Sequence, residues 1–172
     1  MKEINLEKMF LEAYTQYSSK IYKHIFFRVN NSQTAQDLTS ETFLKTWRYL
    51  REGNKIENIK NFIYRVAHNL IVDHYKNNSR HKEVSIEDLT EEPATDSSDF
   101  LESFHLSFEC EYVLKIIPTL PEAYRQIITY RYIDELNVLE IKKITGYSLA
   151  NIYTLTHRAL KMLKEKIHQD EH

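Results

Sequence analysis

The stretch NVLEIKKITGYSLANIYTLTHRALKMLKEKI (residues 137–167) decides how the last part of the chain folds. Asn137 can cap a short helix that runs to Thr145. Gly146 follows, and a glycine suits the tight turn there because it takes a positive φ without strain. Ser148 can then cap a last helix reaching about His168. Two helices joined in this way have the layout of a helix-turn-helix.

A helix-turn-helix places the first turns of its second helix in the major groove of DNA. Four apolar residues are spaced to hold the two helices together: Ile141, Ile144, Ile152 and Leu155. The side chains expected to meet base edges or phosphates are Ser148, Leu149, Ala150, Asn151, Tyr153, Thr154, His157, Arg158 and Lys161. Any helical hairpin with a glycine turn would show the same spacing, so this pattern alone leaves both interpretations open.

A second informative stretch, DLTSETFLKTW (residues 37–47), gathers acids and aromatics on one short helix. Such a mixture is typical of a protein-docking surface. Together the two stretches suggest a protein that brings a large partner to DNA.

The composition predicts an almost wholly helical protein. The 172 residues include only two glycines and three prolines, so the chain has few places to turn. The one cysteine, Cys110, cannot close an intramolecular disulfide, which fits a reducing cytoplasm. No stretch approaches the roughly 18 apolar residues of a membrane-spanning helix, so we expect a soluble cytoplasmic protein.

Charge is partitioned along the chain. The net charge is -2, but residues 83–102 carry eight acids and no Lys or Arg, whereas residues 1–82 are basic on balance. This partition predicts a helical domain over 1–82, a flexible acidic linker over 83–106 and a second helical domain over 107–172. The expected fold is all-α, with the helix-turn-helix in the second domain.

Apolar periodicity places the helices. In the first domain we expect a long helix ending near residues 30–31, a second over 33–50 capped by Ser32, and a third starting at about Asn58. In the second domain, before the helix-turn-helix, we expect a helix over 104–117 stopped by Pro118. Another should start with Pro121 in its first turn and run to about residue 133.

The whole chain resembles the extracytoplasmic-function branch of bacterial RNA polymerase sigma factors. The resemblance rests on DLTSETF (37–43), NFIYRVAHNLIVDH (61–74), LP (120–121) with IITYRY (127–132), and residues 140–160 from EI to RAL, in order and at the right spacing. It covers nearly the full length. It implies a fold of two helical domains that bind core RNA polymerase and promoter DNA.

The resemblance implies that residues 37–47 dock on the clamp helices of the polymerase large subunit. Carboxylates facing an Arg-bearing partner make physical sense there. The expected contacts are Asp37, Leu38, Glu41, Phe43 and Trp47, with Asp37, Glu41 and Trp47 foremost. The alternative is that Leu38 and Phe43 are core residues and that the acids form a solvated face.

The third helix and its sequel resemble the part that recognises and opens the minus-ten promoter element. Aromatic side chains beside cations can hold unstacked bases. The expected contacts are Phe62, Tyr64, Arg65, Asn69, His74, Tyr75, Lys76, Asn77 and Arg80, with Phe62 as well suited to the core. His68 and His74 lie on opposing sides of a helix, which does not favour a metal site. The acidic linker is either a mimic of nucleic acid in the polymerase cleft or a solubilising tether.

The recognition helix departs from the family pattern. Relatives commonly carry Lys or Arg early in this helix, but no fixed positive charge precedes Arg158 here. Phosphate neutralisation and Arg-to-guanine pairing are therefore both reduced. Reading of the minus-thirty-five element through Asn151, Thr154 and thymine methyl groups would favour A·T-rich DNA.

We interpret the chain as a non-enzymatic specificity subunit that binds core polymerase, directs it to promoters and helps open the minus-ten region. No phosphate-binding loop, metal cluster or placed nucleophile points to an enzyme or a cofactor. The alternative is a stand-alone helix-turn-helix regulator that occupies an operator without polymerase. As in many relatives, an anti-sigma protein is a further candidate partner.

Overall fold

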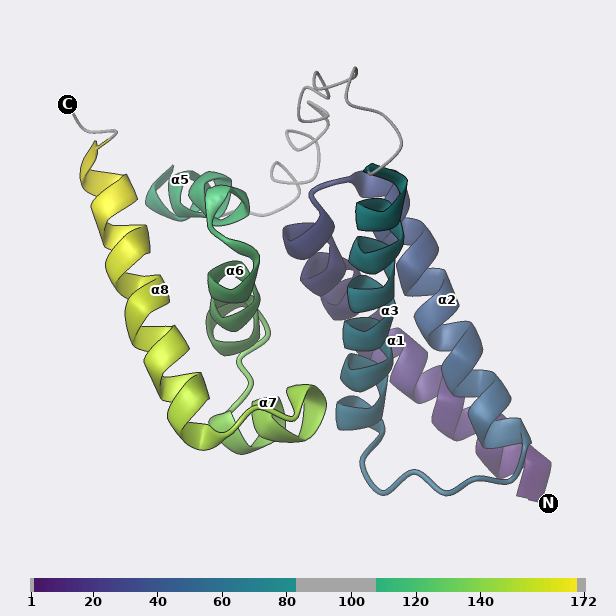
Figure 1. Ribbon diagram of the computed structural model, residues 1–172. Helices are drawn as coiled ribbons and strands as arrows, with labels where there is room; N and C mark the ends of the chain where they lie inside the picture. Colours follow the sequence, from purple (N-terminus) through teal and green to yellow (C-terminus); the bar gives the residue numbers. More distant parts are fainter. Residues whose placement is uncertain (1, 83–107, 170–172) are drawn as a thin grey trace.

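The computed structural model describes residues 2–82 and 108–169, and within these ranges the chain contains helices and no strand. They form two helical domains that lie side by side (Figure 1). The predicted linker, residues 83–106, lies outside the described residues. None of the described helices is long and apolar enough to cross a membrane.

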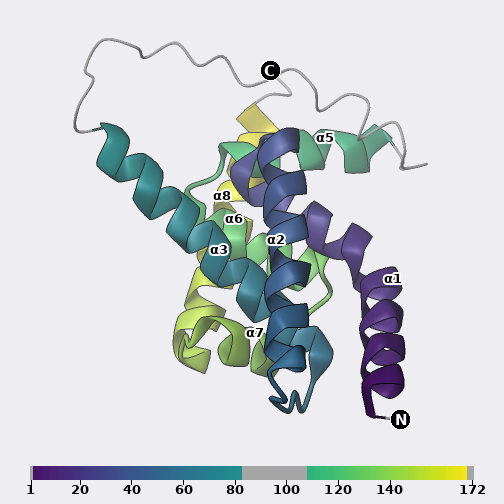
Figure 2. The same cartoon turned by 90° about the vertical axis from the view of Figure 1, so that its right-hand side faces the viewer.

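The first domain consists of α1 (Lys2–Val29), α2 (Ser32–Arg51) and α3 (Ile59–Lys82), packed against one another (Figure 2). Its core is apolar, as the periodicity predicts, with Ile21, Ile25, Ile63, Ala67 and Ile71 fully buried. Asn58 precedes α3 as expected, and its side chain accepts a hydrogen bond from the Asn61 amide at 2.9 Å.

The cap of α2 is Asn31, not Ser32. The Asn31 side chain accepts a hydrogen bond from the Thr34 amide at 2.8 Å. Asn30 adopts a φ of 51°, so the chain turns one residue earlier than predicted and Ser32 starts the helix. The Ser32 hydroxyl lies 3.1 Å from the Tyr22 hydroxyl instead.

The second domain begins with α5 (Phe108–Ile116), a 3₁₀ turn η1 (Ile117–Thr119) and α6 (Glu122–Ile128). Pro118 does not stop the chain's helical path but sits inside η1, where a missing amide hydrogen is tolerated near a helix start. The extended Leu120 ends this segment, and Pro121 is the N-cap of α6 rather than part of its first turn.

A π-helical turn η2 (Thr129–Ile133) continues α6, and α7 (Val138–Thr145) and α8 (Leu149–Gln169) follow. Buried side chains of both domains belong to one continuous apolar cluster. Helix α7 packs on α3, and η2 packs on α1.

Candidate protein-docking and nucleic-acid surfaces

The predicted docking helix, α2, presents its acids to solvent. Asp37 and Glu41 are exposed and lie one turn apart on the same face. Glu41 pairs with Lys45 at 3.3 Å, an exposed contact of the kind that contributes little to stability. Both carboxylates are therefore accessible to a partner.

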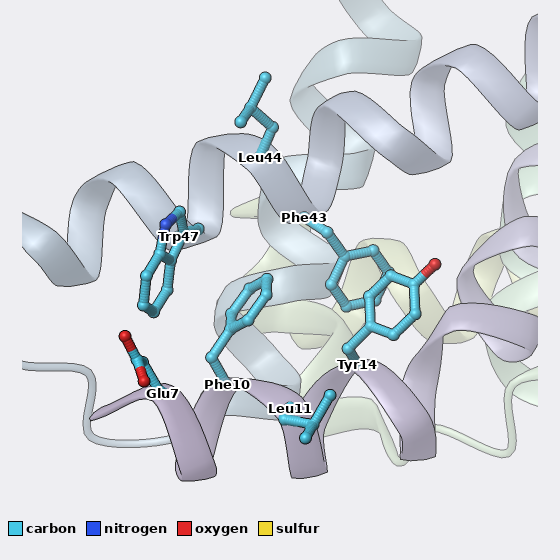
Figure 3. Close-up of a pocket in the computed structure, with 7 residues that line it drawn as sticks. All are labelled: Glu7, Phe10, Leu11, Tyr14, Phe43, Leu44 and Trp47. Atoms are coloured by element: carbon cyan, nitrogen blue, oxygen red, sulfur yellow. The ribbon is translucent and has the colours of Figure 1, made fainter. Parts of the chain in front are cut away.

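An apolar hollow of about 520 Å³ lies between α1 and α2 (Figure 3). Its lining includes Leu44, three residues after Glu41 on the same helix, so the hollow adjoins the exposed acids. Trp47 forms one wall, and its ring centroid lies 5.0 Å from that of Phe10. The lining residues are Glu7, Phe10, Leu11, Tyr14, Phe43, Leu44 and Trp47. The residues that α1 contributes to this lining were not predicted from the sequence. Leu11 was the available signal, because it is apolar, lies outside the buried stripe of α1 and is 64% exposed.

Phe43 and Leu38 point inward. Phe43 is buried, and Leu38 is partly buried against the core cluster. The Phe43 ring packs against Phe10 and Tyr14 and forms part of the lining of the hollow, so a partner can reach it only through the hollow and its direct contact stays a prediction. Its role is to hold α1 and α2 together beneath the hollow.

One face of α3 is open to solvent and carries an aromatic and cationic pair. Arg65 lies over the Phe62 ring at 5.5 Å, and Phe62 in turn packs against Tyr49 of α2 at 4.7 Å between ring centroids. Asn69, one turn beyond Arg65, is exposed. Tyr49 extends this candidate stacking platform. It was not predicted, because its position beside Phe62 depends on how α2 packs against α3 and not on the sequence of α2.

The opposite face of α3 meets the second domain. Tyr64 is buried, and its hydroxyl donates to Asp134 Oδ1 at 3.3 Å. Burial raises the pKa of Tyr64 far above its usual value, and the charge of Asp134 adds to the effect. The prediction that Tyr64 contacts DNA is therefore not supported by this arrangement, because the ring is covered by protein.

Tyr75 is also turned toward the second domain. Its hydroxyl donates to the backbone oxygen of Arg28 and accepts from Arg125 Nη2 at 3.1 Å. His74 is partly buried beside it, whereas Lys76 and Asn77 are exposed. Arg80 belongs to α3, but its side chain lies outside the described part of the structure.

The helix-turn-helix forms as the sequence predicts. Asn137 Oδ1 accepts from the Leu139 and Glu140 amides at 3.0 Å, and Glu140 Oε2 accepts from the Asn137 amide at 2.9 Å. Burial alone would raise the pKa of Glu140, but hydrogen bonds from the Asn137 backbone and Lys60 hold it below its usual value. Gly146 ends α7 with a φ of 77°.

Helix α8 presents the expected surface. Ser148 Oγ accepts from the Asn151 amide at 3.1 Å and so starts the helix. Leu149 is partly buried, and Tyr153 is 60% exposed. The remaining predicted contacts are all exposed: Ser148, Asn151, Thr154, His157, Arg158 and Lys161.

Two family models match the chain, one on each domain. The model of sigma-70 region 2 matches residues 13–81, and that of sigma-70 region 4 matches residues 110–163. Together they cover most of the chain. The docking helix and α3 fall in the first match, and the helix-turn-helix falls in the second.

Curated relatives match over most of this chain. It is 31% identical to the ECF RNA polymerase sigma factor BldN of Streptomyces coelicolor, over 94% of this chain and 61% of that protein. It is 26% identical to the RNA polymerase sigma factor YlaC of Bacillus subtilis, over 91% of this chain and 90% of that protein. It is 25% identical to the ECF RNA polymerase sigma factor SigW of Bacillus subtilis, over 88% of this chain and 84% of that protein. The chain thus spans under two thirds of the Streptomyces relative but most of the two Bacillus relatives.

A solved structure of similar fold is the sigma factor RpoE in complex with the anti-sigma factor NepR from Bartonella quintana. Its TM-score is 0.73 at 18% identity, covering 94% of this chain and 98% of that one. The likeness concerns the fold alone. The two sigma-70 regions in order and the similarity to ECF relatives show that this chain belongs to the extracytoplasmic-function branch of RNA polymerase sigma factors.

Proposed function

We propose that this chain binds core RNA polymerase, directs it to specific promoters and helps open the minus-ten region, working in the cytoplasm. One observation carries the proposal: the chain joins an exposed docking surface to an exposed recognition helix, in the order of sigma-70 regions 2 and 4. The chain's part is recognition and positioning, with no catalytic step of its own.

The docking surface suits a helical partner rich in arginine. Asp37 and Glu41 offer carboxylates for paired hydrogen bonds with guanidinium groups. The hollow beside them accepts an apolar side chain, and a partly exposed Trp such as Trp47 is a typical anchor residue of interfaces. Charge would guide encounter, and the apolar hollow would supply most of the affinity.

The two DNA-binding surfaces have different chemistry. On α3, Tyr49, Phe62 and Arg65 form a platform on which an unstacked base can lie. On α8, Asn151 and Thr154 are exposed at the start of the recognition helix, where base edges are read. The proposal assigns melting to the first surface and upstream recognition to the second.

Capture of core polymerase by tagged protein tests the docking surface. We expect Asp37→Lys with Glu41→Lys to lower capture at least about tenfold, since two charge-assisted contacts become repulsive. The matched control is Glu52→Lys with Glu57→Lys, two exposed acids in and after the C-terminal cap of α2. Circular dichroism checks that both variants stay helical. Equal capture by the two variants would overturn the assignment of this surface.

The stand-alone regulator is not favoured, because it leaves the acidic and apolar surface of α1 and α2 without a role. It predicts tight sequence-specific DNA binding by the free protein, unchanged by the substitutions at Asp37 and Glu41.

We also propose that an anti-sigma protein binds this factor and competes with polymerase. Tagged protein in its own cells should then capture both core polymerase and a smaller inhibitor.

A further inference from the structure

A crevice of about 460 Å³ lies where the two domains meet, apart from both the docking surface and the recognition helix. The first domain lines it with residues of α1 and α3, and the second domain lines it with residues of α6 and with Tyr147 in the turn before α8. Sites for small molecules commonly have volumes of about 300–1,000 Å³. The crevice, called here the polar crevice, is therefore large enough for a small organic ligand.

Arg28 is the most buried residue that lines the polar crevice, with 2% of its side chain exposed. Its Nε donates to Glu122 Oε1 at 3.0 Å, and its Nη2 donates to the same oxygen. Nη1, by contrast, has no hydrogen-bond partner among the residues that the structure describes. A buried nitrogen without a partner is rare, because the lost hydration is not replaced. An acceptor bound in the crevice would provide the missing partner.

The polar crevice has an excess of positive charge. Glu122 is the one acidic residue among the described residues that line it, and its carboxylate already accepts from Arg28 and, at 2.7 Å, from Arg125. Lys76 also lines the crevice, is exposed, and forms no ion pair within ranges 2–82 and 108–169. Three cations thus gather around one carboxylate. A water molecule could satisfy Arg28 Nη1, but only an anion would also offset this charge.

His68 adds a neutral donor to this lining. Gln126 Oε1 accepts from the Tyr147 hydroxyl at 3.3 Å, so the amide nitrogen of Gln126 is the atom that faces His68, 3.0 Å from Nδ1. His68 Nδ1 therefore accepts, and the ring hydrogen lies on Nε2. Burial lowers the pKa of His68 to about 4, so the ring is uncharged at neutral pH and offers this one N–H.

We propose that the polar crevice is a binding site for a small organic phosphate. The phosphate accepts hydrogen bonds from Arg28 and Lys76, which are charge-assisted and therefore strong, and from His68. A phosphate monoester has three terminal oxygens for these three donors, whereas a carboxylate has only two. The organic part of the ligand lies against Val72 and the Tyr147 ring, which supply apolar walls.

Both domains contribute to this site. Arg28, His68 and Lys76 belong to the first domain, and Gln126 and Tyr147 belong to the second. The ligand therefore binds the two domains only as they are packed here, and by linkage it stabilises that packing as its concentration rises. The inference is independent of the proposed function, because binding of the ligand to the free chain involves neither polymerase nor DNA.

Calorimetric titration of the full chain tests the site. The probes are adenosine 5′-monophosphate, ribose 5-phosphate, inorganic phosphate and adenosine. We expect at least one of the two organic phosphates to bind about tenfold more tightly than inorganic phosphate, and adenosine not to bind. The tighter of the two shows whether the ligand is a nucleotide or a sugar phosphate. Lys76→Gln should weaken binding about tenfold, whereas the control Lys55→Gln, at an exposed lysine away from the crevice, should not.

Nuclear magnetic resonance of the histidine rings locates the bound probe. The tighter organic phosphate should shift the ring signals of His68, assigned by their absence in His68→Gln, and leave those of the exposed His157 on α8 unchanged. The site is overturned if neither organic phosphate binds, if adenosine or inorganic phosphate binds equally well, or if Lys76→Gln and Lys55→Gln bind alike. Shifts at His157 without shifts at His68 would also overturn it.

Discussion

Neighbouring residues of one helix carry different roles here. Phe62 and Tyr64 are two positions apart on α3, which turns their side chains by about 200°. Phe62 therefore joins Tyr49 and Arg65 at the surface, whereas Tyr64 is buried against Asp134. Residue type alone predicts a base contact for both. The direction of each side chain decides which of them can make it.

Single residues of α8 should separate affinity from specificity. Arg158 is placed to contact a phosphate. Arg158→Ala should therefore weaken binding to all promoter sequences alike, and it should reduce the slope of log affinity against log salt concentration by about 1. Asn151→Ala or Thr154→Ala should instead change which upstream bases are preferred, at about 1–3 kcal/mol per lost base contact. Transcription from promoter libraries by the holoenzyme measures both.

The control for these variants is Lys164→Ala, an exposed residue further along α8. If scrambling the upstream element leaves initiation unchanged, α8 does not read DNA. The second domain would then serve as a protein contact only.

At the scale of elements, the turn between α7 and α8 sets the geometry of recognition. The capping box at Asn137 fixes where α7 starts, and Gly146 fixes where it ends. A Cβ added at Gly146 would meet nothing within 4 Å, so the glycine is required only by its φ of 77°. Glycine is therefore needed at position 146 for its backbone conformation and not for packing.

Replacing this glycine should destabilise the second domain. We expect Gly146→Ala to lower the free energy of unfolding by about 1 kcal/mol, and Gly146→Asn to lower it less, because Asn tolerates the left-handed region better. Urea unfolding followed by circular dichroism measures both. Gly53→Ala is the matched control: its φ of 83° and open surroundings give a similar loss in the first domain. A larger loss for Asn than for Ala would contradict this account of the turn.

At the scale of the whole molecule, the packing of the two domains against each other, here called the closed form, should depend on pH through His68, which Gln126 of the second domain contacts at 3.0 Å. Burial lowers the pKa of His68 to about 4, and the charges of Arg28 and His24 from α1 add to this effect, while Glu122 from α6 opposes it. When the domains separate, which is here called the open form, the pKa of His68 should return to about 6.5. The open form therefore binds a proton that the closed form does not, between these two values. Closure is fully favoured above about pH 6.5 and weakens as the pH falls toward 4.

Protonation of Glu122 should also weaken the packing of the two domains, at a lower pH than protonation of His68. Burial alone would raise its pKa, but Arg28 and Arg125 hold the pKa below its usual value, so its contribution is lost as the pH falls through that lowered value. Small-angle scattering between pH 7.5 and 5 should show expansion of the wild type. His68→Gln should flatten this response, and the exposed control His157→Gln should leave it intact. A wild type equally compact at both pH values would count against the role of His68.

Local patterns predicted much within each domain. Asn137, Gly146 and Ser148 act through hydrogen bonds and φ values that span a few residues, so their roles follow from sequence. The neighbouring choice between Asn31 and Ser32 depended on the positive φ of Asn30, which no periodicity encodes. The pairing of His24 with Asp134 joins residues 110 positions apart, and helical periodicity carries no information at that range.

The same limit applies to the candidate sites. Tyr64 and Tyr75 were expected to contact DNA because aromatic residues can stack on bases, and nothing in the sequence indicated that both side chains meet the second domain. The hollow at Trp47 needed α1 to be placed beside α2. The exposed acids of α2 and the exposed face of α8 were predictable, because helical spacing alone separates them from the buried stripe.

Promoter opening in a reconstituted system tests the central claim most directly. The measurement is permanganate reactivity of minus-ten thymines on a promoter selected by this factor, with core polymerase and the chain added singly and together. We expect reactive thymines only when both are present, and their loss when Asp37→Lys and Glu41→Lys are combined. Thymines that react with the chain alone, or remain unreactive with both components on every promoter that the complex binds, would contradict it.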